Sequence, residues 1–404
     1  MSRPFVIPLI NRLGAGMQAI GLDPAPLLPQ KLQNSACRRT GLRDFGATDY
    51  QQGLQVLCES ANVSGKLNFI GQMALSRQIR SALITRLQMV ELRKTQPQIF
   101  EHTDLAPLVV VGMPRSGTTY LHRLLSLDPA LRHLKFWEVA NPLPLRNGRK
   151  DRRRQQTMQD LKWIKRIAPE LDAKHYLHAD EAEECLFLLN PTFKSLAFWV
   201  SSPVYGYLEW LHDQDCSEAY EFYRDLLMYF QRQSPDRQLV LKSPVHLGYL
   251  REFRAAIPKA RFIFTHRDAI AVQGSANSLF RTLFGIVSKN LDVPRMARTN
   301  FDLLSIAAER ALEARRLIPN AAFLDLSYPD LLAHPVRCVQ NIYRHFGLEF
   351  TASFQRELQT YIASRPQHKF GVHQYTLKEF GLSEAEVEER FRHFAQLAPS
   401  KIEA

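Results

Sequence analysis

Residues 108–119 read Leu-Val-Val-Val-Gly-Met-Pro-Arg-Ser-Gly-Thr-Thr, an apolar run followed by a turn with two glycines five positions apart. Directly after it, Tyr120 to Leu125 has the character of a helix. A strand, a glycine turn and a helix in this order predict a phosphate-binding loop, because the backbone N–H groups of such a turn converge on an anion at the helix N-terminus. A glycine turn that merely joins strand to helix is the alternative.

The loop lacks the lysine of a nucleotide triphosphatase. Such an enzyme has Gly-Lys followed by serine or threonine, and the lysine reaches the terminal phosphates. Here Thr118 follows Gly117, and the positive charge of the loop comes from Arg115 inside the turn. A P-loop kinase or triphosphatase is therefore one alternative for the function, and the missing lysine argues against it.

A second basic residue follows another apolar run. Residues 261–268 read Arg-Phe-Ile-Phe-Thr-His-Arg-Asp, and Ser275 stands eight positions after Arg267, about two helical turns on. An arginine at a strand tip can fork onto a phosphate, and a hydroxyl on the same helix face can complete the contact. An ordinary ion pair at a helix start is the alternative for the Arg267-Asp268 step.

Together the two segments resemble the sulfotransferases that use 3′-phosphoadenosine-5′-phosphosulfate (PAPS). The loop is similar to the bacterial branch that reads Pro-Arg-Ser-Gly-Thr-Thr and to tyrosylprotein sulfotransferases, and the resemblance covers roughly residues 107–394. It implies that Arg267 and Ser275 hold the 3′-phosphate, and that Lys369 lies in a late segment that folds over the nucleotide. The residues implied to hold the 5′-phosphosulfate are Pro114, Arg115, Ser116, Gly117, Thr118 and Thr119.

The resemblance also implies catalytic residues. Glu138 stands 23 positions after Arg115, where the family has the carboxylate that accepts the proton of the attacking hydroxyl. Lys242 precedes Ser243-Pro244, an element that supports the leaving group in the family, and Arg115 shares the developing charge. A sulfuryl group carries less negative charge than a phosphoryl group, so fixed cations can replace magnesium and no catalytic metal is expected.

Other interpretations of these residues stay open. Glu138 also fits a surface carboxylate paired with Arg132 or Lys135. Lys242 fits a lysine at a strand end. His178 and Glu181 lie in a segment expected to meet the acceptor, so either is an alternative base or substrate contact.

Two further features of the sequence bear on the site. Residues 175–184 contain two histidines and four acidic residues, a set that looks like metal ligands but fits a solvated acidic face better. Leu279 stands where the tyrosylprotein enzymes have a further arginine, four residues after Ser275, and Arg281 is the nearest substitute. The match to the family is therefore weaker for the residues that contact the 3′-phosphate than for the residues of the loop.

The order of apolar and helical patterns predicts the fold class, an α/β fold with a P-loop-like central parallel sheet flanked by helices. The expected strands are residues 108–111, 131–136, 239–241, 261–265 and 322–326. We expect residues 1–100 to form a helical region that acts as a cap or a dimer surface. Residues 101–404 are expected to form the α/β domain, with an aromatic-rich helical insertion at about 152–233.

The composition fits a globular chain with an anionic partner. No apolar stretch approaches the roughly 20 residues that cross a bilayer, and the first residues do not read as a signal peptide. The five cysteines include no Cys-x-x-Cys pair, which favours a reducing cytoplasm. The net charge of +12, dense between residues 146 and 154, fits a charged small molecule, a nucleic acid or an anionic membrane.

With the resemblance, we expect a small-molecule, lipid or glycan hydroxyl as the acceptor and no nucleic acid as a partner. A peripheral membrane contact and a homodimer stay open. The second alternative function is a basic protein that only binds nucleic acid or a membrane surface. It predicts binding that weakens steeply with salt and is unchanged by Glu138→Gln. In a sulfotransferase with Glu138 as base, the same substitution would keep nucleotide affinity and abolish turnover.

Overall fold

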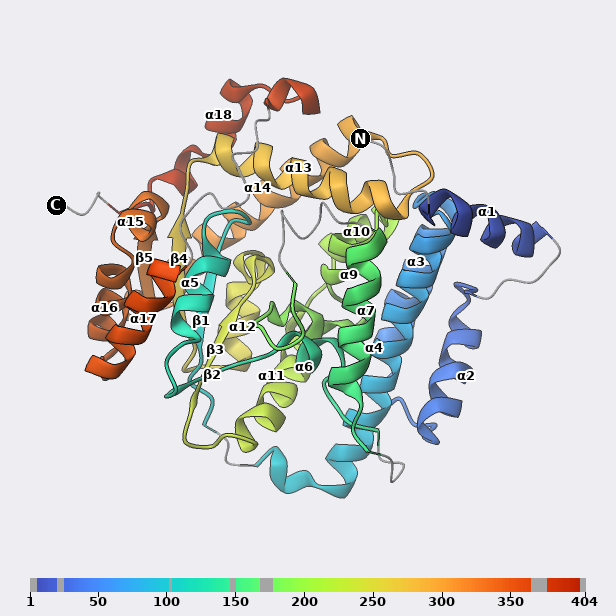
Figure 1. Ribbon diagram of the computed structural model, residues 1–404, viewed down its shortest axis with the longest axis horizontal. Coiled ribbons are helices and arrows are strands. Elements are labelled where there is room, and N and C mark those ends of the chain that lie inside the picture. Colours follow the sequence, from blue (N-terminus) through green and yellow to red (C-terminus); the bar gives the residue numbers. More distant parts are fainter. Residues whose placement is uncertain are drawn as a thin grey trace.

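The computed structural model describes residues 6–19, 25–101, 104–145, 150–167, 177–364 and 376–399. At its centre lies one sheet of five parallel strands in the order β2-β3-β1-β4-β5 (Figure 1). The strands are β1 (Leu108–Gly112), β2 (Leu131–His133), β3 (Gln238–Lys242), β4 (Arg261–His266) and β5 (Phe323–Ser327). The expected α/β fold with a central parallel sheet is therefore confirmed.

All five expected strands are present, but β2 is shorter than expected. A strand was expected over residues 131–136, whereas β2 ends at His133 and the helix α6 (Phe136–Ala140) begins three residues later. The backbone N–H of Lys135, the N-cap residue of α6, donates to Glu138 Oε2 at 2.8 Å. This capping bond favours a helix start where the apolar pattern alone favours a strand.

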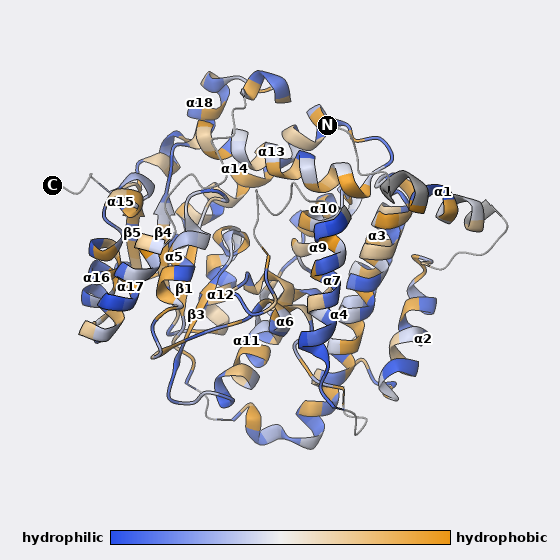
Figure 2. Ribbon diagram, viewed as in Figure 1, coloured by the Kyte–Doolittle hydropathy of each residue, from blue (hydrophilic) through white to orange (hydrophobic). Residues whose placement is uncertain are grey.

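The strands place their side chains in two cores, since successive residues of a strand point to opposite faces of the sheet. In β1, Leu108 and Val110 pack with α5 (Thr118–Leu125) and α16 (Pro335–Phe346), whereas Val109 and Val111 belong to the larger core on the other face. All of β1 is buried, as expected for the central strand of a parallel sheet covered on both faces. Figure 2 shows the hydrophobic colouring of these central strands.

Helices surround the sheet, and further helices lie to one side of it (Figure 1). The N-terminal region forms α1 (Val6–Ala19), α2 (Pro29–Thr40), α3 (Tyr50–Val63), α4 (Phe69–Thr95) and the 3-10 helix η1 (Pro97–Ile99). The insertion between β2 and β3 contains, after α6, the helices α7 (Arg153–Ile167), η2 (Cys185–Thr192), α9 (Ala197–Ser201), α10 (Tyr205–His212) and α11 (Ser217–Arg232). The remaining helices are η3 (Pro244–Tyr249), α12 (Leu250–Ala256), α13 (Ala269–Val287), α14 (Val293–Leu317), η4 (Asn320–Ala322), α15 (Tyr328–Ala333), α17 (Ala352–Ser364), η5 (Leu377–Phe380) and α18 (Glu384–Ala395).

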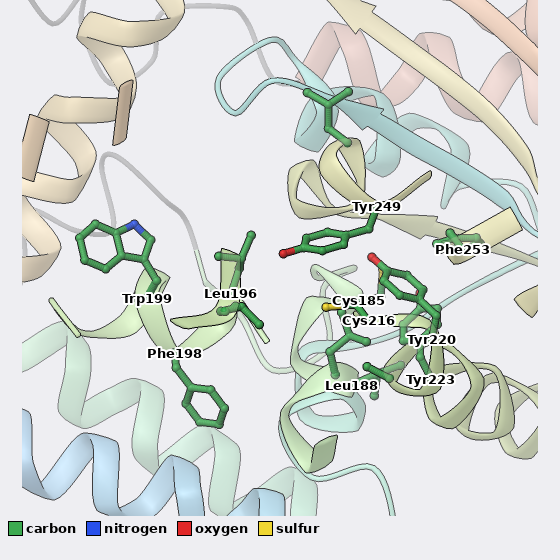
Figure 3. Close-up of a cluster of buried hydrophobic side chains, with 14 of the residues drawn as sticks. Cys185, Leu188, Leu196, Phe198, Trp199, Cys216, Tyr220, Tyr223, Tyr249 and Phe253 are labelled. Atoms are coloured by element: carbon green, nitrogen blue, oxygen red, sulfur yellow. The ribbon is translucent and has the colours of Figure 1, made fainter. Parts of the chain in front are cut away.

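The N-terminal helices and the insertion share one core with the sheet. Arg86 of α4 is buried between them, where it pairs with Asp49 at 2.6 Å and donates to the carbonyl groups of Phe45 and Pro191. Trp163 of α7, by contrast, is 53% exposed. Part of the core appears in Figure 3, and the buried aromatic residues of the insertion include Phe193, Phe198, Trp199, Tyr205 and Tyr207. Within the described residues, no helix is both long and apolar enough to span a bilayer.

Candidate functional site

Three neighbouring strands end at the same edge of the sheet, and most residues predicted for the site lie there. β1 pairs with β3 on one side and with β4 on the other, in parallel register. Residues 113–117 follow β1 as a loop, Lys242 ends β3, and Arg267 follows β4. Ligands of open α/β sheets bind at the carboxyl ends of the strands. The topology therefore brings these segments together although they are far apart in the sequence.

The loop after β1 has a backbone that favours glycine at two positions. Gly112 has a φ of 142° and Gly117 a φ of 92°. A Cβ atom at Gly112 would lie 2.6 Å from the carbonyl oxygen of Thr265, and one at Gly117 would lie 2.8 Å from an aromatic ring. The Ser116 hydroxyl secures the turn, because it donates to the carbonyl of Met113 at 2.6 Å and lies 2.7 Å from Thr265 Oγ1. Neither end of the turn therefore carries a side chain, which is the condition for backbone N–H groups to surround an anion.

Gly112→Ala is expected to destabilise the protein through this loop. The added methyl group must displace the backbone of β4 at Thr265, and alanine disfavours the φ of this position. We expect the free energy of unfolding to fall by about 1–3 kcal/mol, measured by urea denaturation. Gly285→Ala is the control, because a Cβ atom there meets nothing within 4 Å. Equal stability of the two variants would contradict this description of the loop.

Arg115, Arg267 and Ser275 meet beside the loop. Arg115 has a φ of 68°, an uncommon backbone for arginine that occurs at functional turns. Its Nε donates to Ser275 Oγ at 3.0 Å, and Arg267 Nη1 donates to the carbonyl of Arg115 at 2.7 Å. Asp268 caps α13, since its Oδ1 accepts the N–H of Ala271 at 2.8 Å. The structure thus joins the residues that the sequence predicted for the two ends of one nucleotide.

Lys242 is buried at the end of β3, with 1% of its side chain exposed. Its ammonium group lies 2.8 Å from Glu184 Oε1 and donates to Thr119 Oγ1 at 3.3 Å. Thr119 belongs to the first turn of α5, directly after the loop. Because a buried ammonium without a carboxylate is strongly destabilising, Glu184 compensates this charge. Lys242 therefore lies between the helix that follows the loop and an acidic group, rather than at the surface.

Glu138 is also buried, with 5% of the residue exposed, and both of its oxygens are engaged. Arg132 donates to both carboxylate oxygens, to Oε2 at 3.1 Å, and the N–H of Lys135 donates to Oε2 as well. The pairing with Arg132 that the sequence left open is therefore present, inside the protein rather than at its surface. Oε2 thus accepts two hydrogen bonds and Oε1 one, and together they hold the carboxylate in place inside the protein.

Glu184 is the acidic residue that interpretation of the sequence missed. It belongs to the acidic run that was taken for a solvated face, but the N–H of Glu183 donates to the carbonyl of Leu134 at 3.0 Å and ties the run to the segment after β2. At the end of this run the Glu184 side chain, 20% exposed, reaches Lys242. One feature of the sequence indicated this position. Glu184 directly precedes the apolar residues 185–189, Cys-Leu-Phe-Leu-Leu, and a residue next to such a run is expected to lie near the core.

The other predicted residues lie around this centre. His178 is exposed, and its Nδ1 accepts the N–H of Asp180 at 3.3 Å. The Glu181 carbonyl accepts the N–H of Phe136 at 3.0 Å. Arg281 of α13 pairs with a glutamate of η5 at 3.2 Å, and Lys369 lies outside the described residues. Among the described residues, no three or more His, Cys, Asp or Glu side chains are grouped to hold a metal ion.

Two histidines near the site are buried and uncharged. Burial lowers the pKa of His246 to about 3, and burial together with the charge of Lys242 lowers the pKa of His122 to about 3. His246 Nδ1 lies 2.8 Å from the Tyr220 hydroxyl, and its Nε2 lies 3.2 Å from Cys185 Sγ. Both rings are therefore neutral at pH 7, and His246 supports the segment after β3 from the core side.

Comparison with known proteins shows what this chain is similar to. The sequence model described as "Sulfotransferase family" matches residues 107–352. Curated relatives from Mycobacterium bovis and Mycobacterium tuberculosis are both described as omega-hydroxy-beta-dihydromenaquinone-9 sulfotransferase Stf3. They are 26% identical to this chain over 289 residues, which is 68% of this chain and 71% of theirs.

Two solved structures are similar over nearly the whole chain. The sulfotransferase STF9 from Mycobacterium avium has a TM-score of 0.83 at 27% identity and covers 93% of this chain and 97% of its own. The sulfotransferase STF1 from Mycobacterium tuberculosis H37Rv has a TM-score of 0.75 at 29% identity, with 90% of this chain and 98% of its own covered. At this coverage the similarity includes most of the N-terminal helices as well as the sheet.

Proposed function

This chain belongs to the sulfotransferase family, and on that premise we propose that it moves the sulfuryl group of PAPS to a hydroxyl group of its acceptor. The observation that carries the proposal is the contact between Arg115 Nε and Ser275 Oγ at 3.0 Å, beside a loop without a lysine. In PAPS the 5′-phosphosulfate and the 3′-phosphate are separated only by the ribose, so the groups that bind them must be neighbours. Arg115 and Ser275 meet this condition.

The carboxyl edge of the sheet suits PAPS in shape and charge. Gly112 and Gly117 leave no side chain at the ends of the turn, so backbone N–H groups can approach the 5′-phosphosulfate. The two arginines present forked N–H donors whose geometry matches phosphate oxygens. The proposed contacts with the donor are those of Pro114, Arg115, Ser116, Gly117, Thr118, Thr119, Arg267, Ser275 and Lys369.

The proposed reaction is an in-line transfer supported by fixed cations. When bound, the donor supplies an activated sulfuryl group whose leaving group is 3′,5′-bisphosphoadenosine. Lys242, next to Thr119, would stabilise the negative charge on the leaving oxygen, and Arg115 the charge on the sulfuryl oxygens. Because the sulfuryl group carries less negative charge than a phosphoryl group, we propose that these side chains serve in place of a divalent ion.

Two carboxylates compete for the role of general base. The family resemblance implies Glu138, whose two oxygens already accept hydrogen bonds from Arg132. The geometry favours Glu184, because its Oε2 has a long contact of 3.5 Å with the Ser243 hydroxyl, while Oε1 stays with Lys242. In the proposed step, the proton of the acceptor hydroxyl moves to Glu184 Oε2. The acceptor oxygen forms a bond to sulfur, and the bond between sulfur and the leaving phosphate oxygen breaks.

We propose an apolar alcohol, of the lipid class, as the acceptor. The curated relatives carry the name of a hydroxylated menaquinone derivative, which supports this class over a glycan or a small polar phenol. Contact with a membrane surface follows from such an acceptor, because a molecule of this kind resides in a bilayer.

Calorimetric titration with 3′,5′-bisphosphoadenosine in the presence of a chelator tests the donor site. We expect the wild-type protein to bind it, and Arg267→Ala to weaken binding by about tenfold to a hundredfold, since a charge-assisted hydrogen bond is lost. Arg316→Ala, an exposed arginine of α14, is the control. Binding of ATP with magnesium alone would instead favour a kinase or triphosphatase. Salt-sensitive binding to DNA without nucleotide binding would favour a basic nucleic-acid-binding protein.

A further inference from the structure

The N-terminal helices contain a basic cleft far from the loop after β1 in the fold. It lies between α2 and α4, has a volume of about 260 Å³, and is lined by the cationic residues Lys31, Arg38 and Arg80. Lys31 and Arg38 lie seven positions apart on one face of α2, and Arg80 faces them from α4. Among the described residues, none of the three has a carboxylate within 4.0 Å, and no acidic residue lines the cleft. Asn34, Ser35 and Ser76 add polar groups that can donate hydrogen bonds.

Exposed apolar side chains lie on the two helices that form this cleft and on the neighbouring helix α1. Leu28 directly precedes α2 and is 47% exposed, and Met73, one turn before Ser76 on α4, is 48% exposed. On α1, which meets the start of α4 through a hydrogen bond from the N–H of Ile70 to Asn11 Oδ1 at 3.2 Å, Leu13 is 63% exposed. Large apolar side chains at these exposures are unusual on a soluble protein when they gather on one surface.

The exposed Trp163 belongs to the same surface. The start of α7 is tied to the segment after α6, since Arg153 donates to the carbonyl of Asn141 at 3.0 Å, and Ser81 of α4 contacts that segment too. Further along α7, Asp160 pairs with Arg77 of α4. The two helices are therefore antiparallel, and Trp163, one turn after Asp160, lies toward the Met73 end of α4. Figure 1 shows α1, α2 and α7 near α4 in the right-hand half of the molecule.

We propose that this surface docks on a membrane, with the phosphate of an anionic lipid headgroup in the cleft between α2 and α4 and with Leu13, Leu28, Met73 and Trp163 in contact with the acyl region. Cations that bind phosphate next to side chains that prefer hydrocarbon are the two features that interfacial proteins combine. A second copy of the chain is a poorer occupant, because the net charge of +12 makes like surfaces repel. The proposal deepens the proposed function, since it rests on an acceptor of the lipid class.

Vesicle flotation tests the cleft. The wild-type protein is expected to bind vesicles of phosphatidylcholine with phosphatidylglycerol and to stay free of pure phosphatidylcholine vesicles. Replacing Lys31, Arg38 and Arg80 with glutamine is expected to lower the partition coefficient by about 100-fold, because each cation near an anionic surface contributes roughly a fivefold effect. The matched control replaces Arg251, Arg344 and Arg356, which are exposed on α12, α16 and α17, and removes the same charge. Equal losses in both triple variants would overturn the proposal in favour of general attraction by net charge.

Tryptophan fluorescence tests the apolar contact. The emission of the wild-type protein is expected to shift to shorter wavelength on binding anionic vesicles. Trp163→Phe should remove the shift, because Trp199 is buried and the indole nitrogens of Trp137 and Trp210 are buried as well. Vesicle binding without a shift in emission wavelength would contradict the proposed contact between this surface and the acyl region. Titration with 3′,5′-bisphosphoadenosine separates the two proposals: the cleft variant should keep wild-type affinity. If the wild-type protein binds vesicles but does not bind the nucleotide, the proposed reaction is contradicted and the docking surface is still supported.

Discussion

Lys242→Met is expected to lower turnover by about 100- to 1000-fold, the usual effect of removing one group that stabilises charge in the transition state. The Lys242 side chain is 1% exposed, and its ammonium group lies next to the first turn of the helix after the loop. Methionine keeps the length and the apolar part of the side chain, and Glu184 is 20% exposed, so water can reach the carboxylate that loses its partner. Turnover is measured as release of 3′,5′-bisphosphoadenosine from PAPS with an omega-hydroxylated polyprenyl quinone.

The controls for this variant separate catalysis from folding. Lys259→Met removes an exposed lysine whose pair with Asp104 contributes little to stability, so turnover should stay within about twofold. Thermal unfolding and nucleotide affinity show whether Lys242→Met keeps the native fold. A folded Lys242→Met protein with wild-type turnover would remove Lys242 from the mechanism.

Glu184→Gln and Glu138→Gln are expected to have different consequences. Loss of a general base lowers turnover by about 100- to 10,000-fold, and we expect this for Glu184→Gln with nucleotide affinity kept. Glu138→Gln removes the negative charge that faces Arg132 inside the protein, so we expect the free energy of unfolding to fall by about 1.5–3 kcal/mol, the loss of a charged hydrogen bond. Urea denaturation and turnover are measured for both variants.

The pH dependence of turnover assigns the base. In the wild-type protein, turnover should fall at acidic pH as the base becomes protonated, and the variant that lacks the base should lose this acidic limb. A folded Glu138→Gln protein that loses turnover and the acidic limb, beside an active Glu184→Gln protein, would assign the base to Glu138 as the family resemblance implies. Arg132→Lys gives a further check, because it weakens the pair at Glu138 without touching Glu184.

The loop after β1 could be predicted because its information is local. Gly112 and Gly117 stand at two of the three positions with positive φ, and the buried run before them suits the centre of a parallel sheet. The order of apolar runs similarly predicted all five strands. The error at β2 has a local cause as well, since the capping bond between Glu138 and Lys135 starts a helix inside a run that looks like a strand.

The partners of the charged residues could not be predicted in the same way. Glu184 and Lys242 are 58 positions apart, and they meet only because the acidic run lies along the segment after β2, which pairs with β3. The sequence left Glu138 with either a surface or a catalytic role, and burial of the ion pair with Arg132 depends on how α6 packs.

The order of residues alone thus determined the α/β class, the glycine turn after β1 and the family, because each depends on neighbours within one strand, turn and helix. Which carboxylate faces the buried lysine, and which helix surfaces stay uncovered beside the basic cleft, was decided only by the tertiary structure. The physical reason is that a buried charge takes whichever partner the packing of distant segments brings within a few ångströms, and sequence spacing does not encode that distance.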